Sequence, residues 1–431
     1  MTSLPADALT HLLVQVALLL AAAAVGGLAA RTLHQPAVIG YVLAGVVLGP
    51  SVAGRLDAGA WAWLCPSDGP GAGALPALAT LGAVFLLASA GLELDPAVLR
   101  ERGRKLPGLL FGALVPAMAF GFALGWVLPA GFVGGSTSRL GFALLMAIAL
   151  GISSPPVMSA VLRDLKLAHR SFAHVALSTA MFTDVVGWVL LGVVVAGATG
   201  AGGALGKAFA GLALLGLLAG AGWWALGRWG HRIEPDARVV VAVGVIAALA
   251  ALSNGFGIEA VLGAFVAGIV LRRLGDGGAE VGAALQPVAT GFLGPVFFAV
   301  AGLKVDVAQL GSVPVLGWTL VLAAAATVAK VVGSGVPWRL AGRPKSESLA
   351  VGAILNVRGS LEIVLAGVGL AAGILTSASY TSVIVVALVM SSLAAPLIRV
   401  AFGEEGLARR QQPKTGDEPA GDDEPAAPVP V

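Results

Sequence analysis

A single carboxylate, Asp184, lies near the middle of an apolar run that extends from Ala176 to Val195 and holds no other charged side chain. A charge at the centre of a membrane helix costs at least about 2.5 kcal/mol, and such residues usually face a cavity or a partner and mark ion or proton pathways. The isolated position of Asp184 therefore predicts that its carboxylate binds a cation.

Helix-breaking sequences interrupt two further apolar runs. In one of them, Pro155 and Pro156 follow Gly-Ile-Ser-Ser and remove two backbone donors inside the run. In the other, the sequence Asn356-Val357-Arg358-Gly359-Ser360 introduces a charge and a glycine. We expect interrupted helices that meet near the bilayer midplane, although a simple kink is an alternative explanation for the two prolines.

Arg358 and Glu362 are four residues apart in the second interrupted run. In a regular helix this spacing lets the two side chains face each other and neutralise each other locally. A positive charge beside the interrupted helices would also balance the partial negative charge at a helix C-terminus. We therefore expect a structural role for this pair.

Composition defines the class of protein. Of the 431 residues, 58% are hydrophobic and 11% are charged, whereas soluble domains have about a quarter of charged residues. The chain is therefore predicted to be an all-α polytopic membrane protein. Its single cysteine, Cys65, excludes an intramolecular disulfide and a cysteine-rich metal site. The first apolar run is longer than the apolar core of a signal peptide and is expected to be retained.

Apolar windows of about 20 residues give thirteen candidate transmembrane helices. They cover residues 10–30, 36–54, 74–93, 107–129, 139–162, 172–198, 206–228, 238–254, 257–272, 285–303, 313–338, 347–372 and 378–401. With the N-terminus outside and the C-terminus inside, most lysines and arginines fall on the cytoplasmic side, as expected for membrane proteins with short loops. The basic residues left outside are Arg55, Arg139, Lys207 and Lys304.

The two interrupted runs are the fifth and the twelfth of the thirteen. If the seventh run connects two halves, each interruption occupies the fifth position of a six-helix half, and the halves have opposite orientations. This arrangement predicts two inverted six-helix repeats with crossed broken helices. Residues 1–402 would form the transmembrane domain, and the polar, proline-containing segment 403–431 is predicted to be a disordered cytoplasmic tail.

Several segments, in order along the chain, resemble the monovalent cation:proton antiporters of the sodium/hydrogen exchanger superfamily. The resemblance is to the branch that holds Kef-type and Nap-type antiporters and plant cation/proton exchangers. It rests on residues 35–50, 85–93, 262–268, 295–304 and 356–362. It implies a homodimer in which each chain has a dimerisation part and a mobile core part. It also implies exchange of Na⁺ or K⁺ for H⁺ by alternating access, with no enzymatic reaction and no cofactor.

The resemblance also assigns roles to individual residues. It places the ion-binding carboxylate at Asp184, and it matches Ser153 and Ser154 to hydroxyl positions in the first broken helix. Thr183 offers a further oxygen, and oxygen ligands of this kind suit a hard cation. Many relatives have a second carboxylate or an asparagine where this chain has Thr183. With one carboxylate, we expect electroneutral exchange of one proton for one cation.

Lys330 matches a lysine that pairs with the binding-site carboxylate in relatives. Such a pair would offset the cost of burying both charges while the cation is absent. The alternative is that Lys330 only caps the broken helix ends. Lys304 is expected to extend to the aqueous interface beside Asp306, and Glu259 is expected to lie at a solvated helix end or to attract cations.

Other functions remain as alternatives. A gated monovalent cation efflux channel fits the composition equally well, and flux that requires no proton would favour it. No glycine-rich nucleotide-binding turn is visible, so we expect no nucleotide-binding regulatory domain in this chain. The basic residues are spread over membrane rims, where lipid headgroups explain them, and nucleic acid is not an expected partner. No organellar targeting segment is visible, which favours the plasma membrane of a prokaryote.

Overall fold

The computed structural model describes residues 6–33, 35–65, 73–93, 106–198 and 204–411. Within these ranges the regular structure is helical, and the only strand-like feature is an isolated antiparallel bridge between Val133 and Leu375. The all-α architecture predicted from composition is therefore confirmed.

Ten helical segments of the described chain are long and apolar enough to cross a membrane. Two of them combine separate helices: α2 (Ala37–Leu48) is followed by α3 (Ala53–Leu56), and α14 (Asp276–Val288) continues through a π-helical segment, η4 (Ala289–Leu293), into α15 (Gly294–Leu303). A third runs from α11 (Ala204–Trp229) into the short 3-10 helix η2 (Gly230–Arg232). The others are α1 (Ala6–Thr32), α5 (Ala74–Glu93), α7 (Leu106–Val127), α10 (Ser171–Ala198), α12 (Pro235–Gly255), α16 (Val313–Leu340) and α19 (Ser377–Gln411).

Shorter helices occupy the three remaining predicted runs. The fifth run is divided into α8 (Arg139–Gly151) and α9 (Pro155–Asp164), and the twelfth into α17 (Lys345–Leu355) and α18 (Ser360–Ala371). The ninth run holds α13 (Ala260–Leu271). The two interruptions thus lie where the prolines and the Asn-Val-Arg-Gly sequence predicted them.

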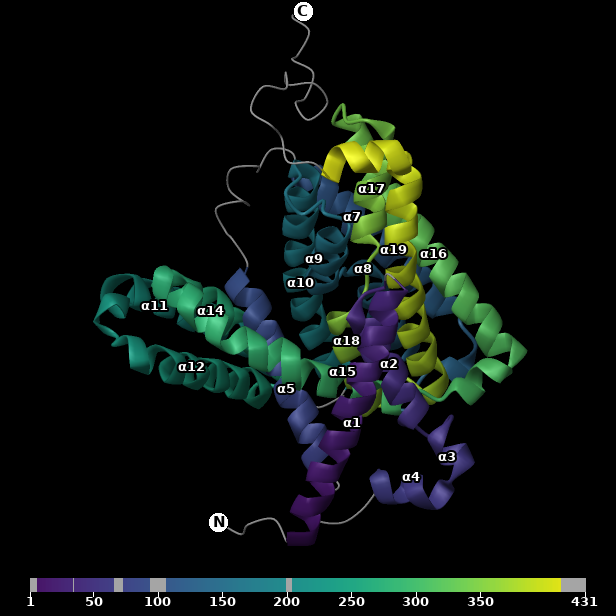
Figure 1. Ribbon diagram of the computed structural model, residues 1–431, viewed down its shortest axis with the longest axis horizontal. Coiled ribbons are helices and arrows are strands. Elements are labelled where there is room, and N and C mark those ends of the chain that lie inside the picture. Colours follow the sequence, from purple (N-terminus) through teal and green to yellow (C-terminus); the bar gives the residue numbers. More distant parts are fainter. Residues whose placement is uncertain (1–5, 34, 66–72, 94–105, 199–203, 412–431) are drawn as a thin grey trace, which may run out of the picture.

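The helices form two groups, and each group packs together helices from the N-terminal and C-terminal halves of the chain (Figure 1). One group contains α1, α2, α5, α12, α13, α14 and α15, and the other contains α7 to α10 and α16 to α19. Helix α11 contacts both α10 and α13, so it connects the groups. All elements of the broken-helix region belong to the second group.

Small residues allow the helices of the second group to approach closely. A Cβ atom on Gly112 of α7 would lie 2.1 Å from the carbonyl oxygen of Gly333 of α16, and one on Gly333 would lie 2.3 Å from the Gly112 oxygen. Close backbone packing at small residues is the usual way in which membrane helices associate. This contact fixes α16, which carries Lys330, against the helix that precedes α8.

The last candidate membrane span ends at Gly403, next to the predicted start of the C-terminal tail. We expected disorder from residue 403 onward, but α19 continues to Gln411 across a kink at Gly403, where φ is +65°. Glycine tolerates this left-handed conformation, so the chain can change direction and then resume a helix. The remainder of the predicted tail, 412–431, lies outside the described residues.

Candidate ion-binding site

The two helix interruptions contact each other directly. The backbone nitrogen of Ser154 donates a hydrogen bond to the carbonyl oxygen of Val357, at 3.0 Å. The hydroxyl of Ser153 donates to the carbonyl oxygen of Leu355, at 2.6 Å. Residues some 200 positions apart in sequence therefore meet at one place, where four helix ends converge.

Asp184 lies on the helix that packs against this crossing. A Cβ atom on Gly187, one turn further along α10, would lie only 2.3 Å from the Cγ2 atom of Ile152, so α10 touches the first interruption. The Asp184 side chain is 3% exposed, and its Oδ1 atom has no hydrogen-bond partner among the described residues. The neighbouring Thr183 donates its hydroxyl proton to the carbonyl oxygen of Ala180, at 2.8 Å, which leaves its oxygen lone pairs available.

Other buried polar atoms at the crossing lack partners in the described part of the chain. They are the hydroxyl oxygen of Ser154 and both side-chain polar atoms of Asn356. Both residues are fully buried. Buried polar groups without hydrogen bonds cost free energy, so the unpartnered oxygen atoms of Ser154 and Asn356 near a buried carboxylate fit a site in which a bound cation supplies the missing interactions.

Lys330 reaches the crossing from α16 and is completely buried. Its Nζ atom donates to the carbonyl oxygen of Gly151 and to the Ser153 hydroxyl, the latter at 2.9 Å. Lys330 is close enough to Asp184 for an electrostatic interaction, but these two described side chains are not in ion-pair contact. In this structure the ammonium group therefore caps the C-terminal end of α8, and pairing with Asp184 would require it to move.

Arg358 and Glu362 cap two of the converging helix ends. The Arg358 guanidinium donates to the carbonyl oxygens of Ala149, at 2.8 Å, Leu150 and Ile152 at the end of α8. Glu362 accepts a hydrogen bond from the backbone nitrogen that precedes α18, at 2.8 Å, and lies 3.3 Å from Arg358. The positive group thus meets a helix C-terminus and the negative group a helix N-terminus, which is the favourable arrangement for helix dipoles.

Gly359 leaves room for the Ser154 side chain, and we expect Gly359→Ala to disturb the site. An added Cβ atom would lie 2.6 Å from the Ser154 hydroxyl oxygen and 2.5 Å from the Val157 side chain. Overpacking of this kind costs about 1–3 kcal/mol, so the thermal unfolding midpoint of the purified protein should fall. Gly367→Ala, on the same helix, is the control because its Cβ would meet nothing within 4 Å. Equal midpoints for the two variants would contradict the close packing of the crossing.

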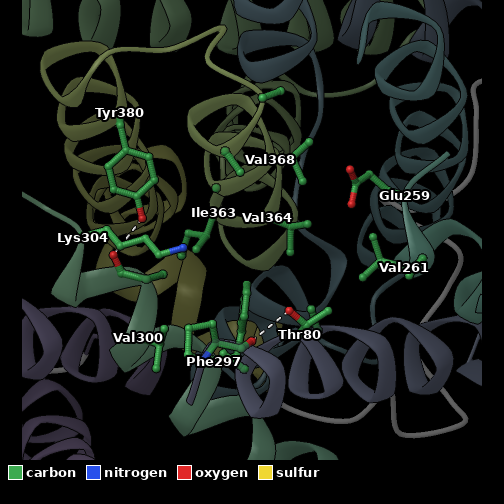
Figure 2. Close-up of a pocket in the computed structure, with 18 of the residues that line it drawn as sticks. Thr80, Glu259, Val261, Phe297, Val300, Lys304, Ile363, Val364, Val368 and Tyr380 are labelled. Atoms are coloured by element: carbon green, nitrogen blue, oxygen red, sulfur yellow. Dashed lines mark hydrogen bonds between the residues drawn. The ribbon is translucent and has the colours of Figure 1, made fainter. Parts of the chain in front are cut away.

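A separate cavity of about 450 Å³ lies between the two helix groups (Figure 2). Apolar residues of α5, α13, α15 and α18 form most of its wall. Two charged residues, Glu259 and Lys304, also line it. Sequence reasoning placed these residues at helix ends but gave no indication of a shared cavity.

The fold and the site define a polytopic membrane protein that is built around crossed broken helices and a buried carboxylate. The transmembrane model of the sodium/hydrogen exchanger family matches residues 17–401, and the chain belongs to this family.

Relatives in several organisms are similar over most of this chain. The chain is 28% identical over 409 residues to the Na⁺/H⁺ antiporter NhaS4 of Synechocystis, which covers 91% of this chain and 97% of the relative. It is 26% identical over 420 residues to the Na⁺/H⁺-K⁺ antiporter GerN of Bacillus cereus, covering 92% and 97%. It is 28% identical over 415 residues to the cation/H⁺ antiporter 20 of Arabidopsis thaliana, covering 91% of this chain. The chain spans about half the length of such plant relatives.

A solved structure has the same fold. The sodium proton antiporter MjNhaP1 of Methanocaldococcus jannaschii superposes with a TM-score of 0.63 at 15% sequence identity, over 93% of this chain and 99% of that chain.

Proposed function

We propose that this protein exchanges Na⁺ or K⁺ for H⁺ across a membrane, and that Asp184 is the group for which the two ions compete. The buried Asp184 carboxylate, with an unpartnered oxygen at the crossing of two broken helices, carries this proposal. Family membership and the names of the relatives support exchange of a monovalent cation for a proton.

Coupling follows from the cost of a bare buried carboxylate. A bound proton or a bound cation neutralises Asp184. The helix group that carries Asp184 then moves and exposes the site to the other side of the membrane. A free carboxylate is too costly to carry across the low-dielectric barrier. The site therefore changes from one side of the membrane to the other only when a proton or a cation is bound. Ser153, Ser154, Thr183 and Asn356 would supply oxygen ligands to the cation.

The remaining parts of the proposal concern the roles of the two helix groups and the placement in the membrane. The group formed by α7 to α10 and α16 to α19 is the moving core, and the group that contains α1, α2, α5 and α12 to α15 forms the dimer contact. Pro155 and Pro156 keep α8 and α9 separate because neither can donate the hydrogen bond that a continuous helix needs. The N-terminus is external, the C-terminus is cytoplasmic, and the membrane is a prokaryotic plasma membrane.

The proposal is tested by proton flux in proteoliposomes that contain the purified protein and a pH-sensitive dye. Addition of Na⁺ or K⁺ on one side should drive protons towards that side, and protein-free liposomes should give no signal. Cation flux without proton movement would instead indicate a channel. A complete lack of cation-driven proton movement for Na⁺, K⁺ and Li⁺ would contradict the proposal.

Lys330→Gln should distinguish pairing with Asp184 from helix capping alone. If the ammonium competes with the cation for Asp184 during the cycle, its removal should lower the cation KM by about tenfold, since charges at a few ångströms interact strongly in a partly buried site. Ser334→Ala, four residues further along α16, should leave the KM unchanged. A lower unfolding midpoint with an unchanged KM would show that Lys330 only caps α8.

A further inference from the structure

The cavity between the two helix groups has an apolar wall with two charged side chains. Glu259 immediately precedes α13, and Lys304 immediately follows α15, so each of the two charged residues lies at the end of a helix that lines the cavity. Figure 2 shows the Lys304 ammonium extending into the cavity, with the Glu259 carboxylate on the opposite side. Neither side chain has a hydrogen bond or an ion pair within the described part of the chain.

Lys304 is exposed, as expected for a lysine that extends to the aqueous interface, and it does not pair with the nearby Asp306. The Asp306 carboxylate instead accepts hydrogen bonds from the Ala308 nitrogen, at 3.1 Å, and from the Gln309 side chain, at 2.9 Å. It thereby caps the short helical segment that follows it. With Asp306 occupied in this way, the Lys304 ammonium is free to point into the cavity.

The apolar walls of the cavity reduce the screening of both charges by water. Glu259 is half-buried, and Lys304 is exposed at the cavity, although the apolar neighbours of its side chain lower its pKa by partial desolvation. A charge in a cleft with low-dielectric walls is screened less than a charge on an open surface, and it changes the local concentration of small ions.

The cavity borders two helices that also carry residues of the candidate ion site. Ile363 and Val364 of α18 line it, and Ile363 directly follows Glu362, which caps the helix crossing. Val195, at the far end of the helix that carries Asp184, lines it as well. An ion that enters this cavity therefore passes through the field of Glu259 and Lys304.

We propose that Glu259 and Lys304 control how cations reach the transport site from this cavity. The Glu259 carboxylate raises the local cation concentration, and the Lys304 ammonium lowers it; neither residue is a ligand at Asp184. The inference rests on the proposed exchange function and adds a pair of charged residues outside the ion site that sets the apparent cation affinity.

The first test measures the cation KM separately on each face of the membrane in oriented vesicles. With the cation supplied on the cavity side, Lys304→Gln should lower the KM by about three- to tenfold and Glu259→Gln should raise it by a similar factor, whereas KM on the other side and kcat should change little. Lys207→Gln is the control: it removes an exposed lysine near the start of α11 that does not line the cavity. An unchanged cavity-side KM in both cavity variants would overturn the inference.

A second test changes the charge after the protein has folded. In a Cys65→Ser background, Lys304→Cys is treated with membrane-impermeant methanethiosulfonate reagents that add either a trimethylammonium or a sulfonate group. The cationic product should restore the wild-type KM, and the anionic product should lower it further. Identical KM values for the two products would overturn the inference. Loss of exchange in the unmodified wild-type protein would instead refute the proposed function itself, so the two failures are distinguishable.

Discussion

Asp184→Asn is expected to reduce cation-driven proton flux at least about 100-fold, because the amide can neither bind a proton as a carboxylate does nor balance the charge of a cation. Folding should not suffer in the same way. Replacing a buried carboxylate with a neutral side chain of similar size removes the cost of burying a charge, so the unfolding midpoint should stay the same or rise. Flux in proteoliposomes and thermal unfolding of the same preparation measure the two effects.

Asp184→Glu and Asp306→Asn are the matched controls for this experiment. The first keeps a carboxylate and should retain coupled flux with a changed cation KM. The second removes a carboxylate that caps a helical segment away from the crossing and should leave coupling intact. Wild-type coupling in Asp184→Asn would show that another group carries the exchanged ion.

Arg358→Met is expected to have the largest effect on stability. The guanidinium is 2% exposed, donates to carbonyl oxygens at the end of α8 and pairs with Glu362. Its loss would leave a buried carboxylate unpaired, and breaking a buried ion pair in this way costs about 3–5 kcal/mol. The unfolding midpoint should fall strongly, whereas Arg339→Met, which removes an exposed arginine from α16, should have little effect.

The double variant Arg358→Met/Glu362→Gln separates the two contributions. Removal of both charges should recover part of the stability, because no unpaired carboxylate remains. The α8 carbonyl groups would still lack their donors, so recovery should be incomplete. Full recovery would show that Arg358 does not stabilise the helix end, and a midpoint equal to that of the single variant would show that the ion pair is unimportant.

The sequence was sufficient to predict those features that depend on residues close together in the chain. Apolar runs located the helices, Pro155 and Gly359 indicated the two interruptions, and the isolation of Asp184 singled out one carboxylate. The spacing of Arg358 and Glu362 also predicted that they could face each other, and they lie 3.3 Å apart. These features depend on residues that are close together in the chain.

Features that depend on distant contacts could not be predicted in this way. Arg358 caps a helix end some 200 residues earlier, and the sequence does not specify which carbonyl groups it will meet. The cavity beside Lys304 is lined by helices from different parts of the chain, so the sequence predicted an exposed lysine at a helix end but not the cavity that it lines. Gly187 allows α10 to approach Ile152 closely, but the sequence alone could not single it out, because glycine is frequent throughout this chain.

The central claim is that one carboxylate exchanges one proton for one cation. The most direct test is to determine the ratio of protons to cations from the point of zero net flux in proteoliposomes, with set cation and pH gradients and with membrane voltage clamped at several values. The account predicts that net flux stops when the cation and proton concentration ratios are equal, at every voltage. A balance point that shifts with voltage would contradict one-for-one exchange at Asp184.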